Sequence, residues 1–119
     1  MKIYLICPVR KATHGQQRLL EEYVYQLRQK GHEVYYPPND NPYEHTDTIG
    51  VDICLDLKRA IEEADEIHIY WDKSSEGSLV DLGMIFMAEK PIKLIKAPES
   101  TPNKSYANVV LNWPWGIVG

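Results

Sequence analysis

Residues 66–83 read EIHIYWDKSSEGSLVDLG, and the pattern of this stretch decides which fold to expect for the chain. The apolar run at residues 66–71 predicts a buried strand, and residues 79–89, rich in Leu, Met, Ile and Phe, predict a helix. A loop of small and polar residues joins the two. A strand, a loop and a helix in this order form the repeating unit of parallel α/β sheets.

The same alternation continues on both sides of this stretch. Strands are predicted at residues 2–7, 33–36, 91–95 and, more weakly, 108–111. Helices are predicted at residues 16–30 and 52–64. A polar, turn-rich segment at residues 39–48 is long enough to be a lid. Together these elements predict a three-layer α/β/α fold of the Rossmann or flavodoxin type, with a parallel sheet of four to five strands.

Composition narrows the class of protein. A chain of 119 residues with 44% hydrophobic residues predicts a single domain over residues 1–119. A net charge of -4 argues against binding to polymeric nucleic acid, and no apolar run approaches the roughly 18 residues that cross a bilayer. Because Cys7 and Cys54 lie far apart and no secretion signal opens the chain, we expect a cytoplasmic protein.

A ligand site is expected where the loops after the first and third strands meet. In an open parallel sheet with the common strand order 2-1-3-4-5, ligands bind at that point, beyond the carboxyl ends of the strands. Ser74, Ser75, Gly77 and Ser78 stand before a helix, whose free N–H groups favour an anion, and Arg10 leaves the first strand toward the same place. The pattern predicts a phosphate cradle.

A structural alternative exists for the same residues. Ser78 and Asp81 have the spacing of a capping box, in which Ser78 begins the helix and Asp81, in its first turn, reaches back to the backbone. This pattern is common, and the sequence alone does not decide between a cap and a cradle.

Two carboxylates are predicted beside the crevice. Asp81 faces it if the preceding loop lines it, and Asp56 lies at the boundary between the apolar and the solvent face of its helix. Asp56 therefore points into a pocket or forms a surface ion pair with Arg59. A pair of converging carboxylates fits cleavage of a glycosidic bond, with one as nucleophile and the other assisting proton transfer.

Other reactive side chains fit a catalytic role less well. The histidines have no metal-ligand spacing, so we expect no metal site, and His68 is expected at a surface or an interface. Cys7 is expected to be a buried structural thiol. Trp113 and Trp115 are expected to anchor the end of the chain or to make a subunit contact.

Over most of its length the chain resembles the nucleoside 2-deoxyribosyltransferase-like family, which includes 2'-deoxynucleoside 5'-monophosphate N-hydrolases. Residues 2–10 look like the family's opening strand, and residues 56–67 are similar to its second helix with its Asp. The sequence SEGSLVDLG at residues 75–83 resembles the family signature S-x-G-x-G-x-E-L-G. Asp81 stands where the family has its nucleophilic Glu, and Ser78 replaces the second glycine.

The resemblance implies cleavage or transfer at the N-glycosidic bond of a nucleoside or its 5'-monophosphate, without a cofactor. Asp81 would attack the anomeric carbon, Asp56 would orient it or help to protonate the departing base, and Tyr4 would fix the sugar. The 5'-phosphate would be held by Arg10, Ser75, Gly77 and Ser78.

The resemblance also implies a homo-oligomer, a dimer or larger. Residues 108–110 look like a segment that some members contribute to a neighbour's active site, so Asn108 would complete the pocket of a second subunit. The alternative is a nucleotide-binding module that has the same crevice and has lost catalysis, because Asp81 is one methylene shorter than Glu and a displacement near 1 Å costs about 100-fold in rate.

Overall fold

The computed structural model describes residues 1–73 and 75–119 of the chain. In this part of the chain, five parallel strands form one sheet in the order β2-β1-β3-β4-β5. The strands are β1 (Lys2–Ile6), β2 (Glu33–Tyr35), β3 (Glu66–Tyr70), β4 (Ile92–Lys96) and β5 (Ile117–Val118). The predicted parallel sheet and its strand order are therefore confirmed.

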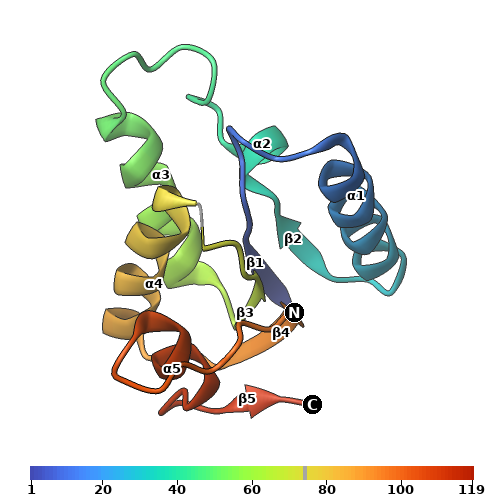
Figure 1. Cartoon of the computed structure of the whole chain (residues 1–119). Coiled ribbons are helices and arrows are strands. Elements are labelled where there is room, and N and C mark those ends of the chain that lie inside the picture. The colour runs from blue at the N-terminus through green and yellow to red at the C-terminus, as the bar shows by residue number, and fades with distance from the viewer. Residues whose placement is uncertain (74) are drawn as a thin grey trace.

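Helices cover both faces of the sheet (Figure 1). Helix α1 (His14–Gln29) packs on one face, and α3 (Val51–Glu63) and α4 (Glu76–Ala88) pack on the other. Two short helices, α2 (Pro37–Asp40) and α5 (Tyr106–Leu111), lie in the connections. Among the described residues, no helix combines the length and the hydrophobicity that crossing a membrane requires.

The central strands are buried on both faces, because successive side chains of a strand point to opposite sides of the sheet. On β1, Tyr4 and Ile6 belong to the core beneath α3 and α4, whereas Ile3 and Leu5 belong to the core beneath α1. Tyr4 is completely buried. The alternation along β1 thus places the Tyr4 side chain on the sheet face that α4 covers.

The prediction of a strand at residues 108–111 is wrong, because this segment belongs to α5. That helix begins where the Ser105 hydroxyl accepts the N–H of Asn108 at 3.1 Å. Its β-branched residues favour a strand locally, but Val110 is fully buried in the core beneath α4, and tertiary packing overrides the local preference. The fifth strand follows Gly116, whose positive φ of 101° turns the chain toward β4.

Tryptophans anchor the final segment, as the sequence predicts. The Trp113 indole N–H donates to the carbonyl of Lys90 at 2.7 Å, and only 5% of Trp113 is exposed. Trp113 and Trp115 both meet the ring of Phe86 edge to face, at centroid distances of 5.6 and 4.8 Å. These contacts fix the segment between α5 and β5 to the outer end of α4.

His68 is buried, so its predicted place at a surface or interface is wrong. It lies on the α1 face of β3, where its Nδ1 meets the Tyr23 hydroxyl at 2.6 Å and its Nε2 meets Glu66 at 2.7 Å. Burial lowers the pKa of His68, although Glu66 opposes this effect. The alternating sequence of β3 suggested an exposed face, but α1 covers it.

The segment predicted as a lid is tied to the start of α3. Asn41 is buried, and its amide donates to the carbonyl of Ile53 at 3.2 Å. At the other end, the Asp47 carboxylate accepts the N–H groups of Gly50 at 2.9 Å and Ile53 at 3.0 Å. Any movement of the segment between these two points is therefore restricted by α3.

Candidate active site

The loops predicted to form the site leave adjacent strands at the same edge of the sheet. Strands β1 and β3 are paired in parallel, with Ile6 opposite Ile69, so the residues after both strands emerge side by side. Ser74, in the second loop, lies outside the described residues. The described part of that loop leads directly into α4 (Figure 1).

Helix α4 begins earlier than predicted, and this moves Asp81 into the second turn. Ser75 is the N-cap: its hydroxyl oxygen accepts the backbone N–H of Ser78 at 3.3 Å and the hydroxyl of Ser78 at 3.0 Å. The alternative in which Ser78 and Asp81 form a capping box is therefore wrong. Because Asp81 is not used by the helix terminus, its carboxyl is available for another role.

Asp81 points into the molecule toward β1. Only 7% of the residue is exposed, and the Tyr4 hydroxyl donates to Asp81 Oδ2 at 3.4 Å. Burial raises the pKa of Asp81 to about 7, and the hydrogen bond from Tyr4 opposes this rise. Near neutral pH the carboxyl is therefore divided between its two protonation states. A buried acid of this kind is typical of functional sites.

Asp56, on α3, has the opposite electrostatic character. Its Oδ2 accepts the hydroxyl of Tyr35 at 2.6 Å, and its Oδ1 accepts the Arg59 Nε–H at 3.1 Å. The predicted ion pair with Arg59 is thus present, and 11% of the Asp56 side chain is exposed. Partial burial raises the pKa of Asp56, but the two hydrogen bonds outweigh it and the pKa is lowered. Asp56 is an anion at neutral pH.

Tyr35 connects the two acids, and it is not among the residues predicted from the sequence to form the site. Its ring stacks on that of Tyr4, with centroids 5.4 Å apart and planes 10° from parallel. The path from one acid to the other therefore runs from Asp81 through Tyr4 and Tyr35 to Asp56. Tyr35 is the register partner of Tyr4 on β2, so the strand order combined with the pairing register was the signal that identifies it.

The residues predicted to hold a phosphate lie at the start of α4 and in the turn after β1. Ser75 and Ser78 bind each other, and Gly77 is exposed, with open space where a Cβ atom would lie. Arg10 is exposed, and within the described part of the chain its guanidinium has no hydrogen-bond or ion-pair partner. The fold brings the three α4 residues together and leaves Arg10 as a separate cation.

Asn108 does not join this cluster within the chain. Its amide nitrogen donates to the carbonyls of Thr101 at 3.1 Å and Asn103 at 2.8 Å, and its oxygen accepts the N–H of Thr101 at 2.9 Å. Helix α5 lies near the C-terminal part of α4 (Figure 1). Asn108 and Phe86 line a small cavity. Within its own subunit, Asn108 stabilises the preceding loop.

Cys7 is buried at the end of β1, as predicted, with 5% of the residue exposed. Burial, reinforced by the nearby Asp81 carboxylate, raises the pKa of the Cys7 thiol to about 12. Because the thiolate is the reactive form of cysteine, this thiol is inert at neutral pH.

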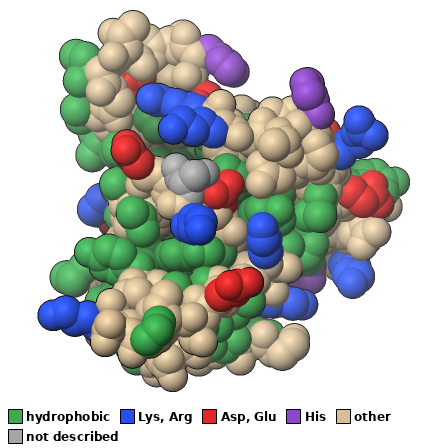
Figure 2. Space-filling view, viewed as in Figure 1, with side chains coloured by type: hydrophobic (Ala, Val, Ile, Leu, Met, Phe, Trp, Pro, Cys, Tyr) green, Lys and Arg blue, Asp and Glu red, His purple; other side chains and the backbone are tan. Residues whose placement is uncertain are grey.

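The surface beside the site carries charges of both signs. Basic and acidic side chains are interspersed on the face shown in Figure 2, and apolar side chains gather at the left, over α3 and α4.

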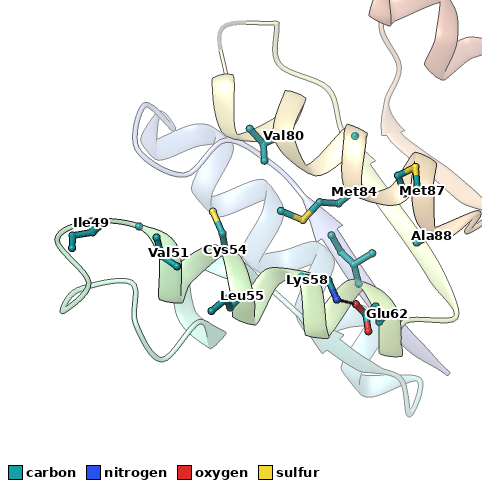
Figure 3. Close-up of a pocket in the computed structure, with 13 residues that line it drawn as sticks. Ile49, Val51, Cys54, Leu55, Lys58, Glu62, Val80, Met84, Met87 and Ala88 are labelled. Carbon is teal, nitrogen blue, oxygen red and sulfur yellow. Dashed lines mark hydrogen bonds and ion pairs between the residues drawn. The ribbon is translucent and has the colours of Figure 1, made fainter.

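An apolar groove of about 940 Å³ runs between α3 and α4 on the outside of the molecule (Figure 3). Cys54 and Leu55 line it from α3, and Val80, Met84 and Met87 line it from α4. The groove does not contain either acid, but Leu55 and Val80 directly precede Asp56 and Asp81 in the chain. Because successive residues of a helix point about 100° apart, the two acids and the groove use adjacent sides of the same helical turns.

Comparison by sequence finds no matching protein-family model and no matching curated protein. Comparison by structure finds similar folds. The CMP N-glycosidase BcmB of Clostridium botulinum has a TM-score of 0.64 and 19% identity, covering 99% of this chain and 88% of that chain. The 2-deoxyribosyltransferase of Bacillus psychrosaccharolyticus has a TM-score of 0.67 and 21% identity, covering 95% and 92%.

A conserved protein of Enterococcus faecalis V583 is also similar, with a TM-score of 0.62 and 17% identity over 97% of this chain and 77% of that chain. Almost all of the present chain takes part in each of these superpositions. The fold that the resemblance implies is thereby confirmed: this chain has the three-layer α/β fold of a 2-deoxyribosyltransferase and of a CMP N-glycosidase.

Proposed function

We propose that the chain is an enzyme that cleaves or transfers the N-glycosidic bond of a nucleoside or its 5'-monophosphate, with Asp81 as the attacking carboxylate. The observation that carries the proposal is the contact of buried Asp81 with Tyr4, at the sheet edge where β1 and β3 end. The choice of bond is supported by two structures of the same fold, which are named as a CMP N-glycosidase and a 2-deoxyribosyltransferase.

The proposed reaction has two steps. A carboxylate oxygen of Asp81 forms a bond to C1', the C1'–N bond breaks, and its electron pair leaves with the base, which takes up a proton. Water or a second base then attacks C1', gives up a proton to solvent and releases the Asp81 carboxylate. The products are a base with the free sugar or sugar phosphate, or the first base with a new nucleoside or nucleotide. Because the transition state resembles an oxocarbenium ion, a carboxylate in a buried site stabilises it strongly.

Tyr4 and the phosphate residues have separate tasks in this scheme. The Tyr4 hydroxyl binds Oδ2 of Asp81, which leaves Oδ1 to attack. A 5'-phosphate at the start of α4 would meet the positive end of the helix dipole beside Ser75 and Gly77, and Arg10 supplies an exposed cation in the turn after β1. These groups favour a nucleotide over an uncharged nucleoside.

The test is release of free base. The full chain is incubated with deoxyribonucleoside and ribonucleoside 5'-monophosphates and with the nucleosides, each with and without an acceptor base, and the products are separated by chromatography. We expect free base from at least one monophosphate, no product with Asp81→Asn, and an unchanged rate with the control Asp52→Asn, an exposed acid on α3.

A nucleotide-binding module is the second candidate. It is favoured by the shorter acid at the nucleophile position and by the raised pKa of Asp81, which keeps part of the population protonated. Saturable binding of a monophosphate, with no base released from any substrate, would replace the enzyme by this module.

The proposal includes association of the chain with itself through the α3–α4 groove. Its rim exposes 85% of Ile49, 83% of Met87 and 59% of Leu55, and clustered exposed apolar side chains are a feature of protein–protein interaction surfaces. The role of Asn108 in a neighbour's site stays a prediction, because its amide holds a loop of its own subunit.

A further inference from the structure

Tyr35 contacts Asp56 directly, and it also contacts Tyr4, the residue that binds Asp81. From β2, its hydroxyl donates to Asp56 Oδ2 at 2.6 Å, which is the shorter of the two hydrogen bonds that tyrosines make to these acids. Its ring lies parallel to that of Tyr4, which in turn donates to Asp81 at 3.4 Å. A change at Tyr35 therefore reaches Asp56 through one hydrogen bond. It reaches Asp81 through the ring contact with Tyr4 and the hydrogen bond from Tyr4.

The donors around Asp56 determine what that acid can do. The Tyr35 hydroxyl and the Arg59 guanidinium both donate, one to each oxygen, and a guanidinium has no acceptor. An ionised carboxylate accepts from both donors, whereas a protonated one would lose the hydrogen bond from one of them. The arrangement favours an Asp56 that orients a group by accepting a hydrogen bond over one that gives up a proton.

We propose that Tyr35 is a positioning residue of the candidate site: its hydroxyl fixes Asp56 as an ionised acceptor, and its ring fixes the plane of Tyr4. This inference rests on the proposed function for its catalytic meaning, but the positioning itself can be measured without turnover. The charged and titratable groups that face Tyr35 are Asp56, Arg59, Tyr4 and, at longer range, Asp40.

The first experiment follows the carboxyl carbon of Asp56 by ¹³C NMR through a pH titration, with the signal assigned by Asp56→Asn. Tyr35→Phe keeps the ring and removes only the hydroxyl that lowers the pKa of Asp56, so we expect the midpoint to move to higher pH. The matched control is Tyr36→Phe, the next residue, which is buried on the opposite face of the sheet. An Asp56 midpoint in Tyr35→Phe equal to that in Tyr36→Phe would overturn the proposal.

The second experiment uses turnover. We expect Tyr35→Phe to lower kcat roughly 10-fold with little change in KM, as the loss of one hydrogen bond to a charged group implies. If Tyr35 acts through Asp56, adding Tyr35→Phe to Asp56→Asn causes no further loss, whereas independent effects would multiply. A full additional 10-fold loss in the double variant would contradict positioning through Asp56.

The ring contact needs a variant of its own. Tyr35→Leu removes the stack on Tyr4 as well as the hydroxyl, so its Asp81 carboxyl midpoint should differ from that of Tyr35→Phe. Equal Asp81 midpoints in the two variants would overturn the part of the proposal that concerns Tyr4.

The experiments separate failure of this inference from failure of the proposed function. A shifted Asp56 midpoint in a chain that releases no base supports positioning by Tyr35 and removes the glycosidic activity. Turnover in a chain whose Tyr35→Phe variant behaves like Tyr36→Phe in both experiments keeps the activity and removes Tyr35 from its machinery.

Discussion

At the scale of single residues, the pKa values of Asp81 and Asp56 are shifted in opposite directions. Burial raises the pKa of Asp81 to about 7, whereas the hydrogen bonds from Tyr35 and Arg59 lower that of Asp56 against the effect of partial burial. The attacking carboxylate of the proposed reaction must be ionised, so a pKa of about 7 places Asp81 at the point where it would gain reactivity. Environments that shift the pKa values of two acids in opposite directions commonly give the acids different roles.

This difference predicts how the rate depends on pH. If Asp81 is the proposed nucleophile, only its ionised form attacks, and kcat/KM should rise as the pH passes through about 7 and then level off. Tyr4→Phe removes a hydrogen bond that lowers the pKa of Asp81, so the rise should move to higher pH.

Initial rates of base release measured from acid to alkaline pH check this prediction. Tyr25→Phe, an exposed tyrosine on α1, serves as the control and should keep the wild-type profile. A profile without a rise near neutral pH would remove Asp81 as the ionising nucleophile.

At the scale of elements, periodicity predicted the strands and helices well where local pattern and packing agree. The apolar runs of β1 and β3 and the apolar faces of α1 and α3 are visible in the sequence because the core dictates them. The start of α4 was misplaced because both Ser75 and Ser78 can cap a helix, and the choice between them depends on the preceding loop. The local sequence predicts a strand where α5 is found, because the burial of Val110 is a tertiary effect that the local pattern does not contain.

The same reasoning explains which parts of the candidate site could be predicted. Asp56 and Asp81 stand out as acids next to apolar faces, so they were found from sequence. Tyr35 is the last residue of a short strand, and its importance follows from its neighbour on β1 and from an acid on α3. Contacts between three separate elements cannot be read from the spacing within any one of them.

The N-cap of α4 gives a prediction at this scale. Ser75→Ala removes the acceptor for the N–H of Ser78 and should lower the free energy of unfolding by about 1 kcal/mol. If the same terminus binds the phosphate, KM for a monophosphate should rise as well. Urea unfolding and steady-state kinetics measure the two effects, and Ser100→Ala, at an exposed position, is the control. Unchanged unfolding in Ser75→Ala would show that the hydroxyl does not stabilise the helix.

At the scale of the whole molecule, the groove between α3 and α4 is an apolar feature of the outer surface. Apolar side chains from both helices face it, and the charged pair Lys58 and Glu62 closes one end (Figure 3). A second copy of the chain offers the same apolar surface, and two-fold association would cover both grooves at once.

Association predicts a mass above that of one chain in light scattering. Met87→Asp places a charge on the most exposed apolar residue of α4 and should weaken association by roughly 2 kcal/mol or more, because a buried unpaired charge is costly. Tyr25→Asp adds the same charge on α1, away from the groove, and should leave the mass unchanged. A wild-type chain that is monomeric at working concentration would remove the proposed interface.

Leu55 and Val80 face the groove, while the residues that follow them in the chain, Asp56 and Asp81, face the tyrosines. Only one peptide bond separates each outward side chain from its inward neighbour. Contacts made in the groove by a second copy would therefore act on the backbone that carries the acids, and the proposed self-association would be linked to the proposed catalysis. An activity per chain that changes when the protein is diluted would reveal this link.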